Sequence, residues 1–162
     1  MNKVVLMSTI ALLALSIMII SPVKAVTVES YWAHHEMDLL YPGVSLPSKG
    51  PIQGGRGLYW YGTNEGSLGE GTLEIWYYHY SLNTATGEGT SVARIRVTIP
   101  GAGTIEGIAR GIFTGFIYNS GTFECSIGTG DFEDLTVIGT YSAVMTSQTA
   151  MQIDCTGTSI YH

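Results

Sequence analysis

The sequence predicts an all-β protein, a single antiparallel eight-stranded barrel preceded by a secretory signal peptide. The chain after residue 25 is rich in Gly, Thr and Tyr and nearly free of lysine, a composition that favours strands. No segment shows a helical period with caps. About eight segments with alternating or apolar character follow one another at the spacing of an antiparallel sandwich or barrel.

One segment favours a barrel over a sandwich. Between Thr104 and Ile117 a Gly or Ala stands at alternate positions, at Gly107, Ala109, Gly111 and Gly115. Because side chains alternate between faces along a strand, one face of this strand is nearly bare. A bare face suits a sheet that bends sharply or receives another group closely, as in a small barrel. A Gly-rich strand in a β-sandwich is the alternative.

The first 25 residues are predicted to be a secretory signal peptide outside the fold. A short basic start ending at Lys3 precedes an apolar run from Val4 to Ile20, and Ala25 ends a stretch with small residues at the cleavage positions. An uncleaved anchor is the alternative, since this run of 17 residues could almost span a bilayer. The mature domain is then residues 26–162, secreted or otherwise extracytoplasmic.

The predicted mature domain is strongly acidic. It holds five basic residues against 13 acidic ones, which gives a net charge of −8. Nucleic acid is therefore excluded as a partner, because phosphates require a basic face. The same charge argues against an anionic membrane surface, so no membrane partner is expected after signal cleavage. A domain of this length suits one core.

The first half of the domain contains four predicted strands and one long loop. Val26 to Ala33 begins the fold, and the Pro- and Gly-rich stretch from Pro42 to Gly57 is predicted to be a loop. Leu58 to Tyr61 is a short aromatic strand, and Ser91 to Ile99 alternates as a half-buried strand does. Thr72 to Leu82 is aromatic on both faces, with Leu73, Ile75, Tyr77 and His79 on one and Glu74, Trp76, Tyr78, Tyr80 and Leu82 on the other.

Three further strands follow the bare-faced one, at Thr122 to Ile127, Leu135 to Val144 and Gln148 to Thr156. Cys125 and Cys155 lie on the more apolar faces of two of them. An even cysteine count in an exported chain predicts one disulfide, which would stabilise the fold by roughly 3 kcal/mol. Two buried free thiols are the alternative if these strands are not neighbours.

The residues after Cys125 carry a family resemblance. The stretch from Gly128 to Phe132 (GTGDF), Leu135-Thr136 and Gly139 to Tyr141 resemble a signature of the allene oxide cyclase and dirigent barrel superfamily, most closely its uncharacterised prokaryotic members. Val137 departs from it, standing where a glycine is usual. The resemblance implies an eight-stranded barrel with a largely apolar cavity, often assembled as a homo-oligomer. Plant members guide ring closure or coupling of reactive small molecules, but none of their charged cavity residues matches a position here.

Aromatic side chains form the main candidate binding site. Tyr and Trp line pockets because each offers apolar area and one hydrogen bond. Ordinary barrel packing is the alternative. Glu74 and Glu106 are the candidate catalytic residues, since a carboxyl group buried in the lumen would have a raised pKa and could act as an acid or base. The candidate ligand-binding residues are Tyr59, Tyr61, Trp76, Tyr78, Tyr80 and Arg110.

Two clusters of polar residues are interpreted as solvated surface. His34, Glu36 and Asp38 share one face of a strand, and the turn from Asp131 to Asp134 is acidic. For a zinc site, which needs three or four ligands, His79 or His162 would have to join the first cluster, and calcium needs six or more oxygens, which a loop with three acids rarely supplies. No metal and no cofactor are expected.

These observations favour an exported barrel that binds a small apolar or aromatic ligand in its lumen. A cofactor-free isomerase or cyclase of the same fold is one alternative, and a structural or oligomeric surface protein is another. An open cavity would favour binding, and a buried ionisable group beside it would favour an enzyme. A filled lumen with a large apolar outer patch would favour the structural protein.

Overall fold

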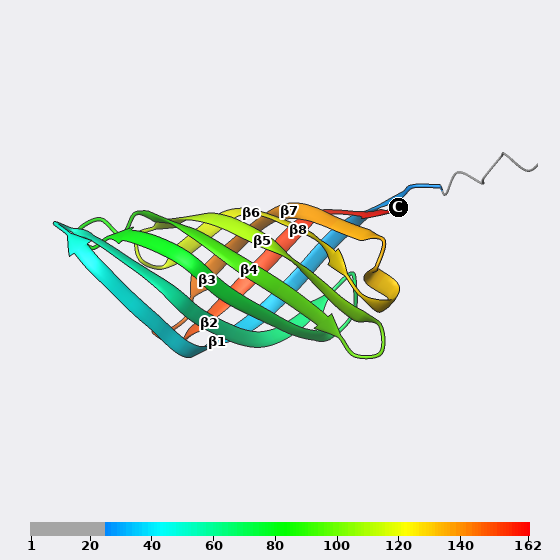
Figure 1. Cartoon of the computed structure of the whole chain (residues 1–162), viewed down its shortest axis with the longest axis horizontal. Coiled ribbons are helices and arrows are strands. Elements are labelled where there is room, and N and C mark those ends of the chain that lie inside the picture. Colours follow the sequence, from blue (N-terminus) through cyan, green and yellow to red (C-terminus); the bar gives the residue numbers. More distant parts are fainter. Residues whose placement is uncertain (1–24) are drawn as a thin grey trace, which may run out of the picture.

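A computed structural model describes residues 25–162, which form one antiparallel barrel of eight strands (Figure 1). Each strand pairs with the next in sequence, and the last pairs with the first, which closes the ring. The predicted fold class is confirmed. The elements are β1 (Thr27–Lys49), β2 (Ile52–Gly66), β3 (Gly71–Asn83), β4 (Gly89–Ile99), β5 (Gly103–Thr114), β6 (Tyr118–Gly128), the 3₁₀ turn η1 (Gly130–Phe132), β7 (Leu135–Met145) and β8 (Ala150–Tyr161).

The predicted signal peptide, apart from Ala25, falls outside the described residues. Within residues 25–162, no helix has the length and apolar character needed to cross a membrane.

Strand alternation separates the interior of the barrel from its outer wall. On β4 the odd-numbered side chains from Ser91 to Ile99 are buried, while Arg94 and Arg96 lie half-exposed on the outside. The buried apolar residues of the eight strands and η1 form one hydrophobic cluster. At about 25 cal/mol for each Å² of apolar surface buried, this interior supplies the main stabilisation of the fold.

The barrel has two dissimilar ends. Four turns, at residues 50–51, 84–88, 115–117 and 146–149, gather at one end, called the open end below (Figure 1). The turns at 67–70 and 100–102, the segment 129–134 and the C-terminus gather at the other, called the closed end.

The motif from Gly128 to Phe132 lies at the closed end. A Cβ at Gly128 would lie 1.7 Å from the Phe132 carbonyl oxygen, so the chain turns back on itself where only glycine fits. The ring of Phe132 is buried, and Thr129 Oγ1 accepts a hydrogen bond from the Thr104 N–H at 3.0 Å. Val137, the departure from the motif, packs as an ordinary core residue that is 2% exposed.

The predicted loop from Pro42 to Gly57 is wrong, because this stretch extends the hairpin of β1 and β2. Ser45 pairs with Gly55, while β8 pairs with β1 only as far as Asp38. Beyond that point the outer edge of β1 has no neighbouring strand. Proline, which lacks an N–H donor, is tolerated on such an edge. The Pro and Gly content therefore marks an edge hairpin.

The predicted disulfide is also wrong, since Cys125 and Cys155 are buried free thiols. β6 and β8 each pair with β7, where Cys125 faces Val137 and Cys155 faces Tyr141. Two strand spacings of about 4.8 Å each separate the cysteines across the sheet. A bridge requires Cα atoms within about 7 Å. Burial raises the pKa of both thiols to about 12, so both are neutral and weakly nucleophilic.

Reducing agent is therefore expected to leave the melting temperature unchanged. Ellman's reagent should detect no thiol in the native protein and two per chain in denaturant, because both sulfur atoms lie in the core. A drop of several degrees on reduction would indicate a disulfide and contradict this arrangement.

Candidate functional site: a cavity at the open end of the barrel

The barrel interior contains two unfilled spaces of different size. The inner space holds about 50 Å³, and the cavity toward the open end, called the end cavity below, holds about 370 Å³. Tyr77 and Ala143 line both, so they lie between them. Liquid water occupies about 30 Å³ per molecule, whereas ligand pockets usually measure about 300–1,000 Å³. Of these two interior spaces, only the end cavity has room for a ligand.

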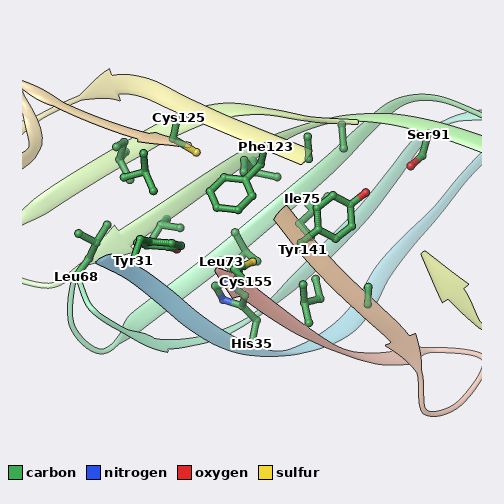
Figure 2. Close-up of a pocket in the computed structure, with 18 of the residues that line it drawn as sticks. Tyr31, His35, Leu68, Leu73, Ile75, Ser91, Phe123, Cys125, Tyr141 and Cys155 are labelled. Atoms are coloured by element: carbon green, nitrogen blue, oxygen red, sulfur yellow. Dashed lines mark hydrogen bonds between the residues drawn. The ribbon is translucent and has the colours of Figure 1, made fainter. Parts of the chain in front are cut away.

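The inner space is lined by apolar and aromatic side chains from several strands, among them Tyr31, Phe123 and Leu73 (Figure 2). The rings of Tyr31 and Phe123 meet edge to face with centroids 5.7 Å apart. His35, only 2% exposed, places Nε2 3.7 Å from the Cys155 sulfur. Burial lowers the pKa of His35 to about 4, opposed only in part by the backbone of Thr63. The imidazole is therefore neutral at physiological pH.

The end cavity has a mainly apolar wall. Of its 15 lining residues only Asn119 and Gln148 have amide side chains, and the others are aliphatic, aromatic or Met. Among the described residues, no Asp, Glu, Lys or Arg lines either space. The apolar members are Leu39, Leu58, Trp60, Tyr77, Tyr80, Leu82, Phe113, Phe116, Ile117, Tyr118, Ala143, Met145 and Met151.

A bulge in β3 gives this cavity one of its walls. The register between β3 and β4 shifts between Tyr77 and His79, so the alternation of faces is interrupted there. Tyr77 and Tyr80 both line the end cavity as a result, and His79 is exposed. A Cβ at Gly55 on β2 would lie 2.3 Å from the Tyr80 ring. The missing side chain at this position leaves the space that Tyr80 occupies.

A buried hydrogen-bonded cluster on β4, β6 and β7 adjoins the end cavity. The Tyr141 hydroxyl donates to Asn119 Oδ1 at 2.6 Å, and Asn119 Nδ2 donates to Ser91 Oγ at 3.1 Å. A Cβ at Gly111 would lie 2.0 Å from the Tyr141 hydroxyl and 2.3 Å from Asn119 Oδ1. The bare face of β5 therefore accommodates this polar cluster.

The rim of the end cavity is apolar and nearly uncharged. Phe116 and Tyr118 are 51% and 54% exposed. Phe116 also has a φ of 66°, which is rare for a bulky residue and holds the turn in a strained shape. The turns at the open end contain one acidic residue, Glu88, whereas those at the closed end contain four. An apolar ligand therefore meets little charge at the entrance.

The structure separates the predicted site residues into two groups. Tyr80 lines the end cavity. Tyr59, Tyr61, Trp76, Tyr78 and Arg110 lie on the outer wall and line neither interior space. Trp60 lies between Tyr59 and Tyr61 on β2 and points inward, where it lines the end cavity. Asn119, which also lines this cavity, was not among the predicted site residues. Strict alternation from a buried neighbour would have identified Trp60.

The candidate catalytic carboxylates also lie outside the lumen. Glu74 accepts a hydrogen bond from the Tyr59 hydroxyl at 2.8 Å, and Glu106 accepts hydrogen bonds from Arg94 and Arg96. Partial burial raises the pKa of Glu106, but the two guanidinium groups outweigh it and leave the pKa below its ordinary value. Both residues therefore belong to a surface ion-pair network, away from either interior space.

Comparisons of the chain with protein-family models, with curated proteins and with solved structures found no significant match. The interpretation of the end cavity therefore depends on its own geometry.

Proposed function

We propose that this protein is an exported barrel that binds a small apolar or aromatic ligand in the end cavity. The observation that carries this proposal is a space of about 370 Å³ with an apolar wall, reached through an apolar rim. Transferring a ligand's apolar surface from water into such a space gains about 25 cal/mol for each Å² buried. The motif resemblance to barrels that handle small molecules in their lumen supports the same proposal.

Binding is better supported than catalysis. An isomerase or cyclase with little apparatus needs a group that can hold or move a proton beside the ligand. His35 lies at the inner space, and Glu74 and Glu106 are held in ion pairs outside. The ionisable side chains among the described residues that line the end cavity are tyrosines, and burial raises the pKa of the innermost, Tyr77, above its ordinary value, which keeps its hydroxyl protonated and makes it a poor base. The end cavity offers apolar contact and a few hydrogen-bonding groups, which is what a binding protein requires.

Titration with the apolar dye N-phenylnaphthylamine is expected to give a blue-shifted increase in fluorescence that saturates. Replacing Leu58, which lines the end cavity, with Trp should weaken dye binding about tenfold or more, because the larger ring fills the space. Tyr61→Trp introduces the same side chain on the outer wall and should leave the affinity unchanged. Absence of binding by the wild type, or equal binding by Leu58→Trp, would contradict the proposal.

A further inference from the structure

We infer that the ligand of the end cavity carries a hydrogen-bond acceptor, such as a carbonyl oxygen, that binds the indole N–H of Trp60. This inference rests on the proposed function and adds the chemical class of the ligand. Trp60 is 3% exposed and lines the end cavity, and its Nε1 atom has no hydrogen-bond partner. It is thus an unpaired donor on a side chain that lines a space large enough for a ligand.

An unpaired buried indole N–H is unusual and needs a reason. The indole nitrogen can only donate, and a buried polar group without a partner loses its hydration with nothing in return. Buried Trp residues therefore usually hydrogen-bond through this group. A Phe at this position would fill an apolar wall without leaving a donor unpaired. The N–H of Trp60 is accounted for if an acceptor arrives with the ligand.

A second donor on the opposite wall points to the same chemistry. Asn119 Oδ1 is occupied by the Tyr141 hydroxyl and one amide N–H by Ser91, which leaves the other amide N–H without an assigned partner. β6, which carries Asn119, is four strands from β2, which carries Trp60, in a ring of eight. Two opposite walls of the cavity therefore each contain a residue with an N–H that has no assigned partner. The ligand class that matches is an apolar or aromatic molecule with a ketone, ester or similar acceptor.

The test compares two competitors that differ by one carbonyl group. Acetylnaphthalene and ethylnaphthalene are used to displace the bound dye from wild-type protein and from Trp60→Phe. A purely apolar cavity would prefer ethylnaphthalene, because the ketone gives up hydration on entering. We expect the wild type to bind the ketone at least as tightly. In Trp60→Phe the ketone should lose about fivefold in affinity relative to the hydrocarbon.

The control variant is Trp32→Phe, which makes the same substitution at a Trp that is 51% exposed on the outer face. It should leave the ratio of the two affinities unchanged. In nitrogen-labelled wild-type protein, the indole N–H resonance of Trp60 should move downfield with the ketone and not with the hydrocarbon. Its signal is assigned by elimination with Trp32→Phe and Trp76→Phe, so this measurement does not require Trp60→Phe to fold.

The outcomes separate the two proposals. If neither the dye nor either competitor binds, the proposed function fails. If all three bind but the affinity ratio is the same in wild type and Trp60→Phe, and the indole resonance does not respond, the ligand class inferred here is wrong while the proposed function stands. If the ratio falls in Asn119→Leu and not in Trp60→Phe, the acceptor binds at Asn119 and the assignment to Trp60 is overturned.

Discussion

Lowering the pH from above 6.5 to about 4 is expected to remove about 3 kcal/mol of unfolding free energy through His35 alone. Burial lowers the pKa of His35 from 6.5 to about 4 in the folded barrel. Between pH 6.5 and about 4, His35 is protonated in the unfolded chain but stays neutral in the folded barrel. The unfolding free energy is therefore highest above pH 6.5 and falls progressively as the pH is lowered toward 4. The neighbouring Tyr31 and Cys155 do not contribute, because burial raises their pKa values.

Urea unfolding across this pH range would measure the effect, with two histidine variants as a matched pair. His35→Leu should remove most of the dependence because it deletes the buried imidazole. His34 is the next residue on β1 but points outward, where its Nδ1 lies 2.7 Å from Asp154 Oδ1. His34→Gln should therefore retain the wild-type slope between pH 6.5 and 4. An unchanged slope in His35→Leu would show that His35 is not the group responsible.

The barrel itself could be predicted because its signals are local. Alternation along Ser91–Ile99 places each side chain by its neighbours, and the bare face around Gly107 and Gly111 indicates a strongly curved sheet. Both signals hold wherever the strand is regular. They give the number and order of the strands, and in an up-and-down barrel that order is also the pairing.

The site was harder to predict because it depends on where alternation fails and on which face is inside. β3 has aromatic side chains on both faces, so composition does not distinguish them. The bulge after Tyr77 then exchanges the faces, which brings Tyr80 inside and leaves Tyr78 and Trp76 outside. A bulge is a two-strand property that depends on the partner strand as well as on β3. This is why, among the predicted aromatic residues of β3, Tyr80 lines the end cavity and Trp76 and Tyr78 do not.

The predictions of a disulfide and of a loop from Pro42 to Gly57 were wrong for a related reason. Whether Cys125 and Cys155 can bridge depends on β7 lying between their strands, which spacing in the sequence does not show. Whether a stretch rich in Pro and Gly is a loop depends on whether its outer edge has a neighbour. β8 pairs with β1 only as far as Asp38, so the extension of β1 beyond Asp38 has no neighbour on its outer edge. Both questions concern non-local contacts.

Replacing Gly111 with alanine is expected to destabilise the barrel by about 3 kcal/mol. The added Cβ would lie 2.0 Å from the Tyr141 hydroxyl and 2.3 Å from Asn119 Oδ1. The cluster would have to separate, which leaves buried polar groups unpaired at about 1–3 kcal/mol each, with a similar cost for overpacking. The backbone at Gly111 is not left-handed, so the cost comes from the cluster and not from φ. Urea unfolding would measure it.

Gly54→Ala is the matched control, since Gly54 also lies in a strand but its added Cβ would approach nothing closer than 3.4 Å. Its stability should stay within about 0.5 kcal/mol of the wild type. Adding Tyr141→Phe to Gly111→Ala removes the nearest colliding atom, so the two effects should be less than additive. If Gly111→Ala matched Gly54→Ala, the cluster would have room to move and could not be a rigid wall. A large difference would tie the bare face of β5 to the polar group beside the end cavity, because only a missing side chain leaves Asn119 and Tyr141 in hydrogen-bonding contact there.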